Sequence, residues 1–136
     1  MKTGFTCSCF DLLHAGHVLM LQECKSNCDY LVVGLQTDPT LDRPSDKNKP
    51  VQSLMERFIQ LNAVGCVDFI YLYETEDDLL KLLNIVSPDV RFIGEDYKNN
   101  NYTGDDLNIE IYYTKRYGYS TTGLRQRIKG ETQCQT

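Results

Sequence analysis

The chain places both of its histidines, His14 and His17, three residues apart in the stretch CSCFDLLHAGH. Imidazoles at this spacing can bind a metal, cap a turn or donate hydrogen bonds to phosphate oxygens. A zinc site needs three or four ligands, so Asp11 or Cys9 would have to supply a third. Gly16 lets backbone come close to a ligand, and a helix that begins there would point free N–H groups at an anion. The residues alone favour phosphate binding and leave a structural turn and a metal site open.

Cysteine is the other metal-binding residue type in quantity, and the chain has six. Cys24 and Cys28 have i,i+4 spacing, but no second CxxC or CxH pair completes a tetrahedral site. The N-terminus lacks the apolar segment and cleavage site of a secretory signal. We therefore expect reduced thiols that pack as small apolar groups, in a cytoplasmic protein.

Length and charge limit the classes of function. A chain of 136 residues fits one domain, and no apolar run approaches the roughly 20 residues that a membrane helix needs. The net charge of −5, from 14 basic and 19 acidic residues, argues against nucleic acid as a partner. Two basic segments, 43–57 and 115–129, suit a small anionic ligand better than a polymer.

The pattern of apolar residues alternates between strands and helices along the chain. It predicts strands at 3–10, 29–36, 67–73, 89–94 and 108–114, and helices at 17–27, 54–65, 76–86 and 121–128. Ser53, with Glu56, and Thr75 are the expected helix caps.

This alternation predicts the α/β class. We expect a single Rossmann-like, doubly wound parallel sheet of five strands, most simply in the order 3-2-1-4-5, with helices on both faces. Residues 1–130 form the expected domain and 131–136 a flexible C-terminal tail. Ligands of such sheets bind beyond the carboxyl ends of the strands, where the strand order reverses. That point lies beside the first strand, so the fold places His14 and His17 in the ligand crevice.

The stretch FDLLHAGH resembles the HxGH signature of the nucleotidyltransferase superfamily, and FDLLHxGH resembles its cytidylyltransferase branch. Four further stretches fall in the family's order: DYLVVGLQTD (29–38), KNKPVQSLMERF (47–58), DVRFIGEDY (89–97) and RYGYSTTGLR (116–125). The match spans about residues 4 to 128. In length and motifs the chain is most similar to the glycerol-3-phosphate cytidylyltransferases.

The resemblance implies transfer of CMP from CTP to a small phosphomonoester such as glycerol 3-phosphate, with release of pyrophosphate and formation of a CDP-alcohol. Such in-line transfer needs no protein nucleophile and depends on positioning and charge neutralisation. It also implies Mg²⁺, held mainly through the nucleotide phosphates, and a homodimer. Phosphoethanolamine or phosphocholine as acceptor, an adenylyltransferase that uses ATP, and a non-catalytic nucleotide-binding module remain alternatives.

The resemblance also assigns roles to residues. Phosphate contacts during catalysis fall to His14, His17, Lys47 and Arg116. Nucleotide binding falls to Ser8, Cys9, Phe10, Gly16, Lys49, Gly94, Asp96, Tyr119, Ser120, Thr121 and Thr122. Acceptor binding falls to Asp11, Asp38, Arg57 and Tyr97, and no residue is assigned as a firm metal ligand.

Several of these assignments have structural alternatives. Spacing does not decide between Lys47 and Lys49, Arg57 could pair with a neighbouring acid, and Ser120 could simply cap a helix. Ser8, Cys9 and Gly65 depart from the family pattern, which keeps the nucleotide-binding module open. The stretch NNNYTG (99–104) has no family counterpart and is expected to be a lid or a surface loop.

Overall fold

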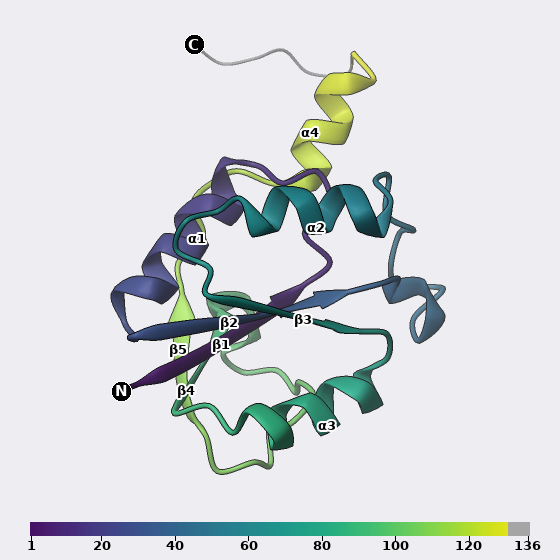
Figure 1. The fold of residues 1–136 in the computed structure, drawn as a ribbon. Helices are drawn as coiled ribbons and strands as arrows, with labels where there is room; N and C mark the ends of the chain where they lie inside the picture. Colours follow the sequence, from purple (N-terminus) through teal and green to yellow (C-terminus); the bar gives the residue numbers. More distant parts are fainter. Residues whose placement is uncertain (131–136) are drawn as a thin grey trace.

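A five-stranded, all-parallel sheet forms the centre of the protein, seen in a computed structural model that describes residues 1–130 (Figure 1). Its strands are β1 (Thr3–Ser8), β2 (Tyr30–Gln36), β3 (Phe69–Tyr73), β4 (Val90–Gly94) and β5 (Glu110–Thr114). The spatial order is β3-β2-β1-β4-β5, with every neighbouring pair parallel. The class, the strand number and the order predicted from the sequence are confirmed.

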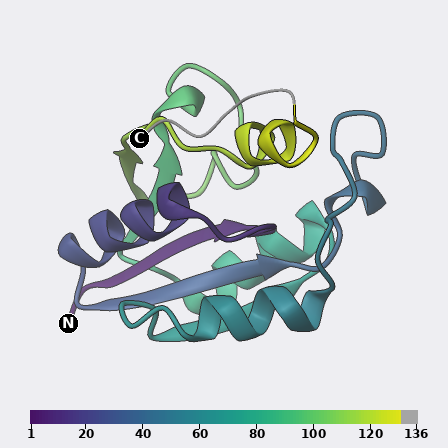
Figure 2. The same ribbon diagram turned by 90° about the horizontal axis from the view of Figure 1, so that it is seen from above.

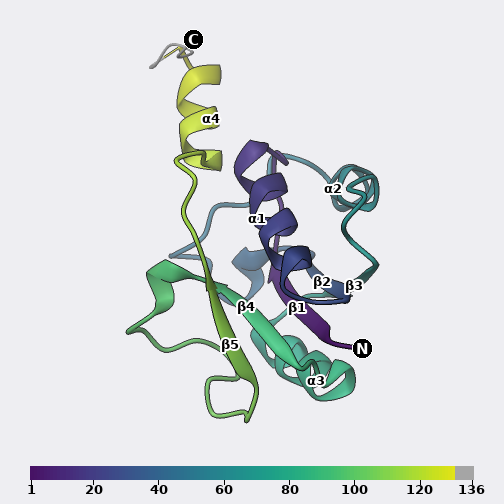
Figure 3. The ribbon, with the colours of Figure 1, turned by 90° about the vertical axis from the view of Figure 1, so that its left-hand side faces the viewer.

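Helices cover both faces of the sheet. Helices α1 (Ala15–Ser26) and α2 (Leu54–Asn62) lie over one face, and α3 (Glu76–Val86) lies on the other (Figures 1 and 2). Helix α4 (Thr121–Ile128) begins beside the start of α1 and projects away from the sheet (Figure 3). Two short 3-10 turns, η1 (Pro39–Leu41) and η2 (Glu95–Tyr97), follow β2 and β4.

Local chemistry explains where the helices begin. Ser53 caps α2 and Thr75 caps α3, each through a reciprocal capping box, as predicted. Helix α1 begins two residues earlier than predicted, because His14 caps it. Strand β1 ends at Ser8 rather than residue 10, since Phe10 and Leu12 adopt positive φ angles that turn the chain out of the sheet.

Two apolar layers hold the sheet in place. The layer under α1 and α2 is built from Phe10, Leu21, Cys24, Leu31, Val33, Leu35, Leu61, Val90 and Phe92. The layer under α3 is built from Phe5, Val32, Tyr73, Leu79, Leu82 and Leu83. The cysteines within residues 1–130 are free thiols, and burial raises the pKa of Cys24. The predicted flexible tail and Cys134 lie outside the described residues.

No helix in the described part of the chain is long and apolar enough to cross a membrane.

Candidate functional site

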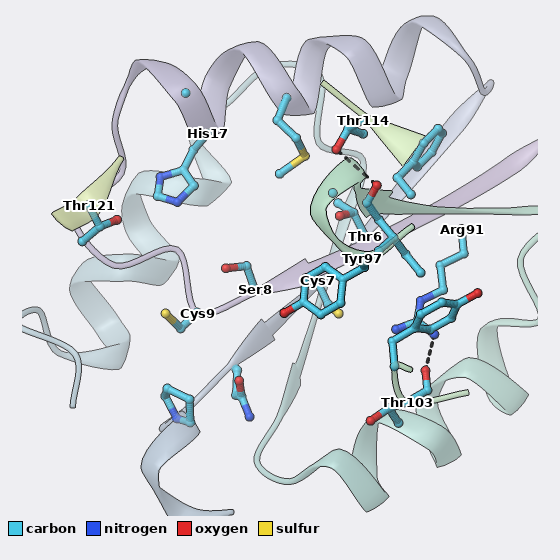
Figure 4. A pocket seen from close by; sticks show the side chains of 18 of the residues that line it. Thr6, Cys7, Ser8, Cys9, His17, Arg91, Tyr97, Thr103, Thr114 and Thr121 are labelled. Atoms are coloured by element: carbon cyan, nitrogen blue, oxygen red, sulfur yellow. Dashed lines mark hydrogen bonds between the residues drawn. The ribbon is translucent and has the colours of Figure 1, made fainter. Parts of the chain in front are cut away.

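A cleft of about 1000 Å³ opens at the carboxyl ends of β1 and β4 (Figure 4). The sequence predicted a ligand crevice at this place, where the strand order reverses. Its walls come from the start of α1, the loop after β2, the segment after β4 and the approach to α4. Of the predicted site residues it is lined by Ser8, Cys9, His14, Gly16, His17, Lys47, Gly94, Tyr97, Arg116, Tyr119, Ser120 and Thr121.

Both histidines have their Nδ1 atom occupied by the backbone at the start of α1. His14 Nδ1 accepts from the Gly16 N–H at 3.0 Å, and His17 Nδ1 accepts from the His14 N–H at 3.2 Å. The rings stack with centroids 3.8 Å apart. In a neutral imidazole whose Nδ1 accepts, the proton sits on Nε2. The two residues therefore cap the helix and still offer Nε2–H groups to a ligand.

Burial keeps both imidazoles neutral near pH 7. It lowers the pKa of His14 and that of His17 to about 4, where the neighbouring His14 adds to the lowering and Asp11 opposes it. The Phe10 ring, fully buried, packs 5.3 Å from the His17 ring. An anion bound at the histidines would favour their charged forms, so phosphate binding and protonation are coupled here.

A second helix start faces the same end of the cleft. Ser120 caps α4 by accepting from the Gly123 N–H at 2.9 Å, and Thr121 Oγ1 donates to the Asp11 carbonyl at 3.3 Å. The segment that leads into α4 packs closely against the start of α1. A Cβ on Gly16 would lie 2.9 Å from the His14 ring and 3.1 Å from Tyr119 Cβ. Two helix N-termini thus converge where an anion would be stabilised.

Two predicted cations reach the cleft. Lys47 lines it and Lys49 does not, so the structure distinguishes two lysines that spacing could not. Arg116 also lines it, and its Nη1 pairs with Asp96 at 2.9 Å between two exposed side chains. Such an exposed pair is weak and can open to a phosphate. Asp96 and Thr122 lie outside the cleft lining.

Asp11 is a buried residue that connects the segments around the cleft. Its carboxylate is 4% exposed. It accepts from the N–H groups of Val51 and Gln52 at 2.9 and 3.0 Å and forms an ion pair with Arg125 at 3.0 Å. One carboxylate therefore joins the histidine loop, the start of α2 and helix α4, which is positioning rather than acceptor binding.

The expectation that Arg57 binds the acceptor is corrected by the structure. Arg57 is 2% exposed and lies outside the cleft lining. Its guanidinium donates to the carbonyls of Cys9, Gln36, Thr37 and Gln52. These carbonyls occupy four of its five N–H donors, so the buried charge is satisfied within the protein.

Asp38 and Phe10 also differ from their predicted roles. The Asp38 carboxylate caps η1 by accepting from Thr40 N–H and Oγ1 at 2.9 and 2.6 Å, and these hydrogen bonds hold its pKa below the usual range. The Phe10 side chain is in the core. Its contact with a nucleotide could come only from the backbone.

Sequence reasoning missed the half of the cleft that faces α3. The lining residues that were assigned no role from the sequence are Thr6, Cys7, Met20, Gln36, Pro39, Arg43, Tyr73, Glu76, Leu79, Arg91, Phe92, Ile93, Asn101, Tyr102, Thr103, Asp105, Thr114, Lys115 and Tyr117. One signal was available: Arg91 is a charged residue inside a strand predicted to be covered on both faces.

A metal site does not emerge from the geometry of residues 1–130, where no group of three or more His, Cys, Asp or Glu side chains could hold a metal ion.

A doubly wound α/β fold whose histidine-capped helix faces the cleft at the switch point defines a nucleotide-handling class of protein. The chain belongs to the cytidylyltransferase-like family, whose sequence profile matches residues 5–127. The predicted membership of the HxGH nucleotidyltransferase superfamily is thereby confirmed.

Curated relatives include the bifunctional protein HldE of Helicobacter pylori, 37% identical over 129 residues, and that of Campylobacter concisus, 39% identical over 129 residues. Each alignment covers 94% of this chain, which spans about 28% of the length of the first and 27% of the second.

Among solved structures, the lipopolysaccharide core biosynthesis protein of Thermoplasma volcanium matches with a TM-score of 0.67 and 27% identity, covering 88% of this chain and 99% of that one. Pantoate-beta-alanine ligase of Francisella tularensis matches with a TM-score of 0.60 and 21% identity, over 94% of this chain and 69% of that one, which shows a shared fold.

Proposed function

We propose that this domain transfers a nucleoside monophosphate from a nucleoside triphosphate to the phosphate of a small phosphorylated acceptor. An acceptor phosphate oxygen forms a bond to the α-phosphorus, the bond from that phosphorus to the β-phosphate bridging oxygen breaks, and pyrophosphate leaves with the electron pair. The supporting observation is the pair of imidazoles whose Nδ1 atoms are occupied and whose Nε2–H groups remain available beside a second helix N-terminus.

Charge neutralisation is the chemistry that these residues can supply. His14 and His17 would donate from Nε2 to phosphate oxygens, and their rise in pKa on binding would increase the stabilisation as charge develops. The N–H groups at the start of α4 would bind the leaving phosphates. Lys47 and Arg116 would neutralise the triphosphate from the other walls of the cleft.

Mg²⁺ is part of the proposal through the nucleotide. When bound to a triphosphate it neutralises negative charge and orients the phosphates. Within residues 1–130 no cluster of three carboxylate, thiol or imidazole groups offers a protein cage. The phosphate oxygens of the nucleotide, together with water, would therefore supply most of the Mg²⁺ coordination.

For the donor we propose CTP, because FDLLHAGH resembles the cytidylyltransferase signature and the family model matches the chain. ATP is the donor to compare, because the HxGH motif is common to cytidylyltransferases and adenylyltransferases. For the acceptor we propose a phosphorylated sugar. The Thermoplasma volcanium relative is a lipopolysaccharide core biosynthesis protein, and such a core is an oligosaccharide. Glycerol 3-phosphate, phosphoethanolamine and phosphocholine become comparison compounds.

The test is pyrophosphate release from each nucleoside triphosphate in turn, with Mg²⁺ and a panel of phosphomonoesters. We expect release with one nucleotide and a sugar phosphate. We expect His17→Ala to lower kcat by roughly 100-fold or more with an unchanged circular dichroism spectrum. The matched control is Ser26→Ala, at the far end of α1. Tight nucleotide binding without pyrophosphate release from any pair would instead support the nucleotide-binding module.

A further inference from the structure

The stretch without a family counterpart, residues 99–104, forms one wall of the cleft together with the residues on either side of it. Residues 97–105 contribute Tyr97, Asn101, Tyr102, Thr103 and Asp105 to the cleft lining. Thr103 Oγ1 donates to Glu76 Oε2 at 3.0 Å, which fastens the segment to the start of α3. Gly104 has a φ of +82°, and a Cβ there would lie 2.9 Å from Leu83 Cδ1. The segment is thus packed against the body of the protein rather than free on its surface.

Arg91 lies under this wall and is 5% exposed. Its Nη1 donates to the Thr103 carbonyl, and its Cζ lies 5.2 Å from the centre of the Tyr102 ring. Within residues 1–130 that carbonyl is its one oxygen acceptor, and no carboxylate forms an ion pair with it. Burial raises the pKa of the Cys7 thiol, and the adjacent Arg91 charge opposes the rise, which places the guanidinium against β1.

Arg57 supplies the comparison within the same chain. Both arginines are almost fully buried, but Arg57 donates to four carbonyls and lies outside the cleft. Arg91 donates to one and lines the cleft. The other Arg91 donors are not among the buried unpartnered side-chain atoms of the described residues, so they open onto the cleft, where water or a ligand can accept from them. The difference marks Arg91 as a ligand-binding arginine.

Other polar groups extend the same end of the cleft. Arg43 pairs with Glu76 Oε1 at 2.8 Å, and its buried Nε has no hydrogen-bond partner among the described residues. Glu76 therefore positions both Arg43 and Thr103. Figure 4 shows Arg91 and Thr103 at one end of the pocket and His17 and Thr121 at the other. A ligand that reaches both ends must present phosphate at the histidines and oxygen atoms at Arg91.

We propose, resting on the proposed function, that Arg91 determines acceptor specificity by donating to oxygen atoms at the end of the acceptor farthest from its reacting phosphate. Residues 97–105 hold Arg91 in place and limit the length of the acceptor. The planar, charged donor set suits either adjacent hydroxyl oxygens or a carboxylate. Glycerol 3-phosphate offers fewer such oxygens than a phosphorylated sugar.

The test compares wild type with Arg91→Met and Arg91→Lys, using glucose 1-phosphate, glucuronic acid 1-phosphate and glycerol 3-phosphate. We expect Arg91→Met to raise the KM for the preferred sugar phosphate roughly 10- to 100-fold while the KM for the nucleotide stays unchanged. Arg91→Lys should give an intermediate KM for the sugar phosphate, because lysine keeps the positive charge but lacks the planar pair of N–H donors of a guanidinium. A preference for the glucuronic acid compound identifies a carboxylate partner, and a preference for glucose 1-phosphate identifies hydroxyls.

Folding is checked separately. Arg91→Met should keep a Tm close to wild type, whereas Arg57→Met, the matched control, should lower it because four carbonyls lose their donor. An unchanged acceptor KM in Arg91→Met, with an active wild type, overturns this inference and leaves the proposed function intact. If wild type releases no pyrophosphate from any pair, the proposed function fails. The same sugar phosphates are then tested for their ability to raise the Tm of the protein. The inference is overturned if they do not raise the Tm of wild type, or if they raise the Tm of Arg91→Met by the same amount.

Discussion

At the scale of single residues, His17 makes stability depend on pH. Burial lowers its pKa from 6.5 to about 4 in the folded protein. The unfolded chain therefore binds more protons between these values, so the contribution is complete above about pH 6.5 and is lost as the pH falls towards 4. We expect wild type to lose on the order of 2 kcal/mol of unfolding free energy across this range through His17.

Urea unfolding between pH 7 and 4.5 measures this loss. His17→Gln keeps a neutral side chain and should remove most of the pH dependence. His14→Gln should reduce the pH dependence by less than His17→Gln, because it removes one imidazole whose pKa burial lowers and also removes the His14 contribution to the lowered pKa of His17. An equal loss of stability in wild type and His17→Gln contradicts the assignment.

Arg57 is expected to be a structural residue. Replacing it with Met leaves the carbonyls of Cys9, Gln36 and Thr37 buried without their donor. We expect Arg57→Met to destabilise the protein by about 3–5 kcal/mol, or a fall in Tm of about 10 °C or more, measured by thermal unfolding. A Tm within a few degrees of wild type would show that these hydrogen bonds are replaced by water.

The sequence could not separate Arg57 from Arg91. Both arginines stand among apolar residues, and the difference between them is the number of backbone carbonyls that approach each guanidinium. Those carbonyls come from the residue after β1, from the last residue of β2 and the one that follows it, and from residue 52, which are distant in the chain. The positions of the two histidines could be predicted from the sequence, because the strand that precedes them and the glycine between them are local features.

At the scale of elements, the caps carried most of the predictive information. Ser53 and Thr75 begin their helices as predicted because hydroxyl caps are strong local signals. The predicted start of α1 was two residues too late, because an imidazole is an unusual helix cap. The segment after β4 was not interpretable from sequence, since Thr103 and Gly104 are fixed by contacts with α3 and Arg91.

Asp11 and Arg125 should couple α4 to the histidine loop. Asp11→Ala removes three hydrogen-bond partners and should cost about 3–5 kcal/mol, whereas Arg125→Met removes one and should cost about 1 kcal/mol. In the double-mutant cycle we expect a coupling of about 1 kcal/mol in unfolding free energy, because Arg125→Met should cost almost nothing once Asp11 is absent. Strictly additive effects would show that the ion pair contributes nothing.

The same pair should affect the proposed reaction. Arg125→Met frees the start of α4, where Ser120 and Thr121 line the cleft. We expect the KM for the nucleoside triphosphate to rise while the KM for the acceptor is unchanged, measured by pyrophosphate release. Arg127→Met, on the same helix, is the matched control.

At the scale of the whole molecule, the topology followed from the alternation of elements alone, because right-handed crossovers leave few orders for five parallel strands. That order leaves β3 at an edge of the sheet, with an unpaired backbone on its outer side. Leu72 on this strand is 52% exposed, and it lines a hollow of about 580 Å³ with Tyr71, Leu54 and Ile85. For the homodimer that the family resemblance implies, we propose this face as the interface.

The dimer prediction is that Leu72→Glu shifts the protein towards the monomer, because a charge at the centre of an apolar contact must be desolvated on association. Light scattering and sedimentation over a range of protein concentrations measure the change. Ile128→Glu is the control, since Ile128 is 75% exposed on α4, away from β3. If the β3 edge forms the interface, Leu72→Glu raises the dissociation constant at least tenfold and Ile128→Glu leaves it unchanged. A wild-type monomer at every concentration, or a dimer indifferent to Leu72→Glu, rules out this face.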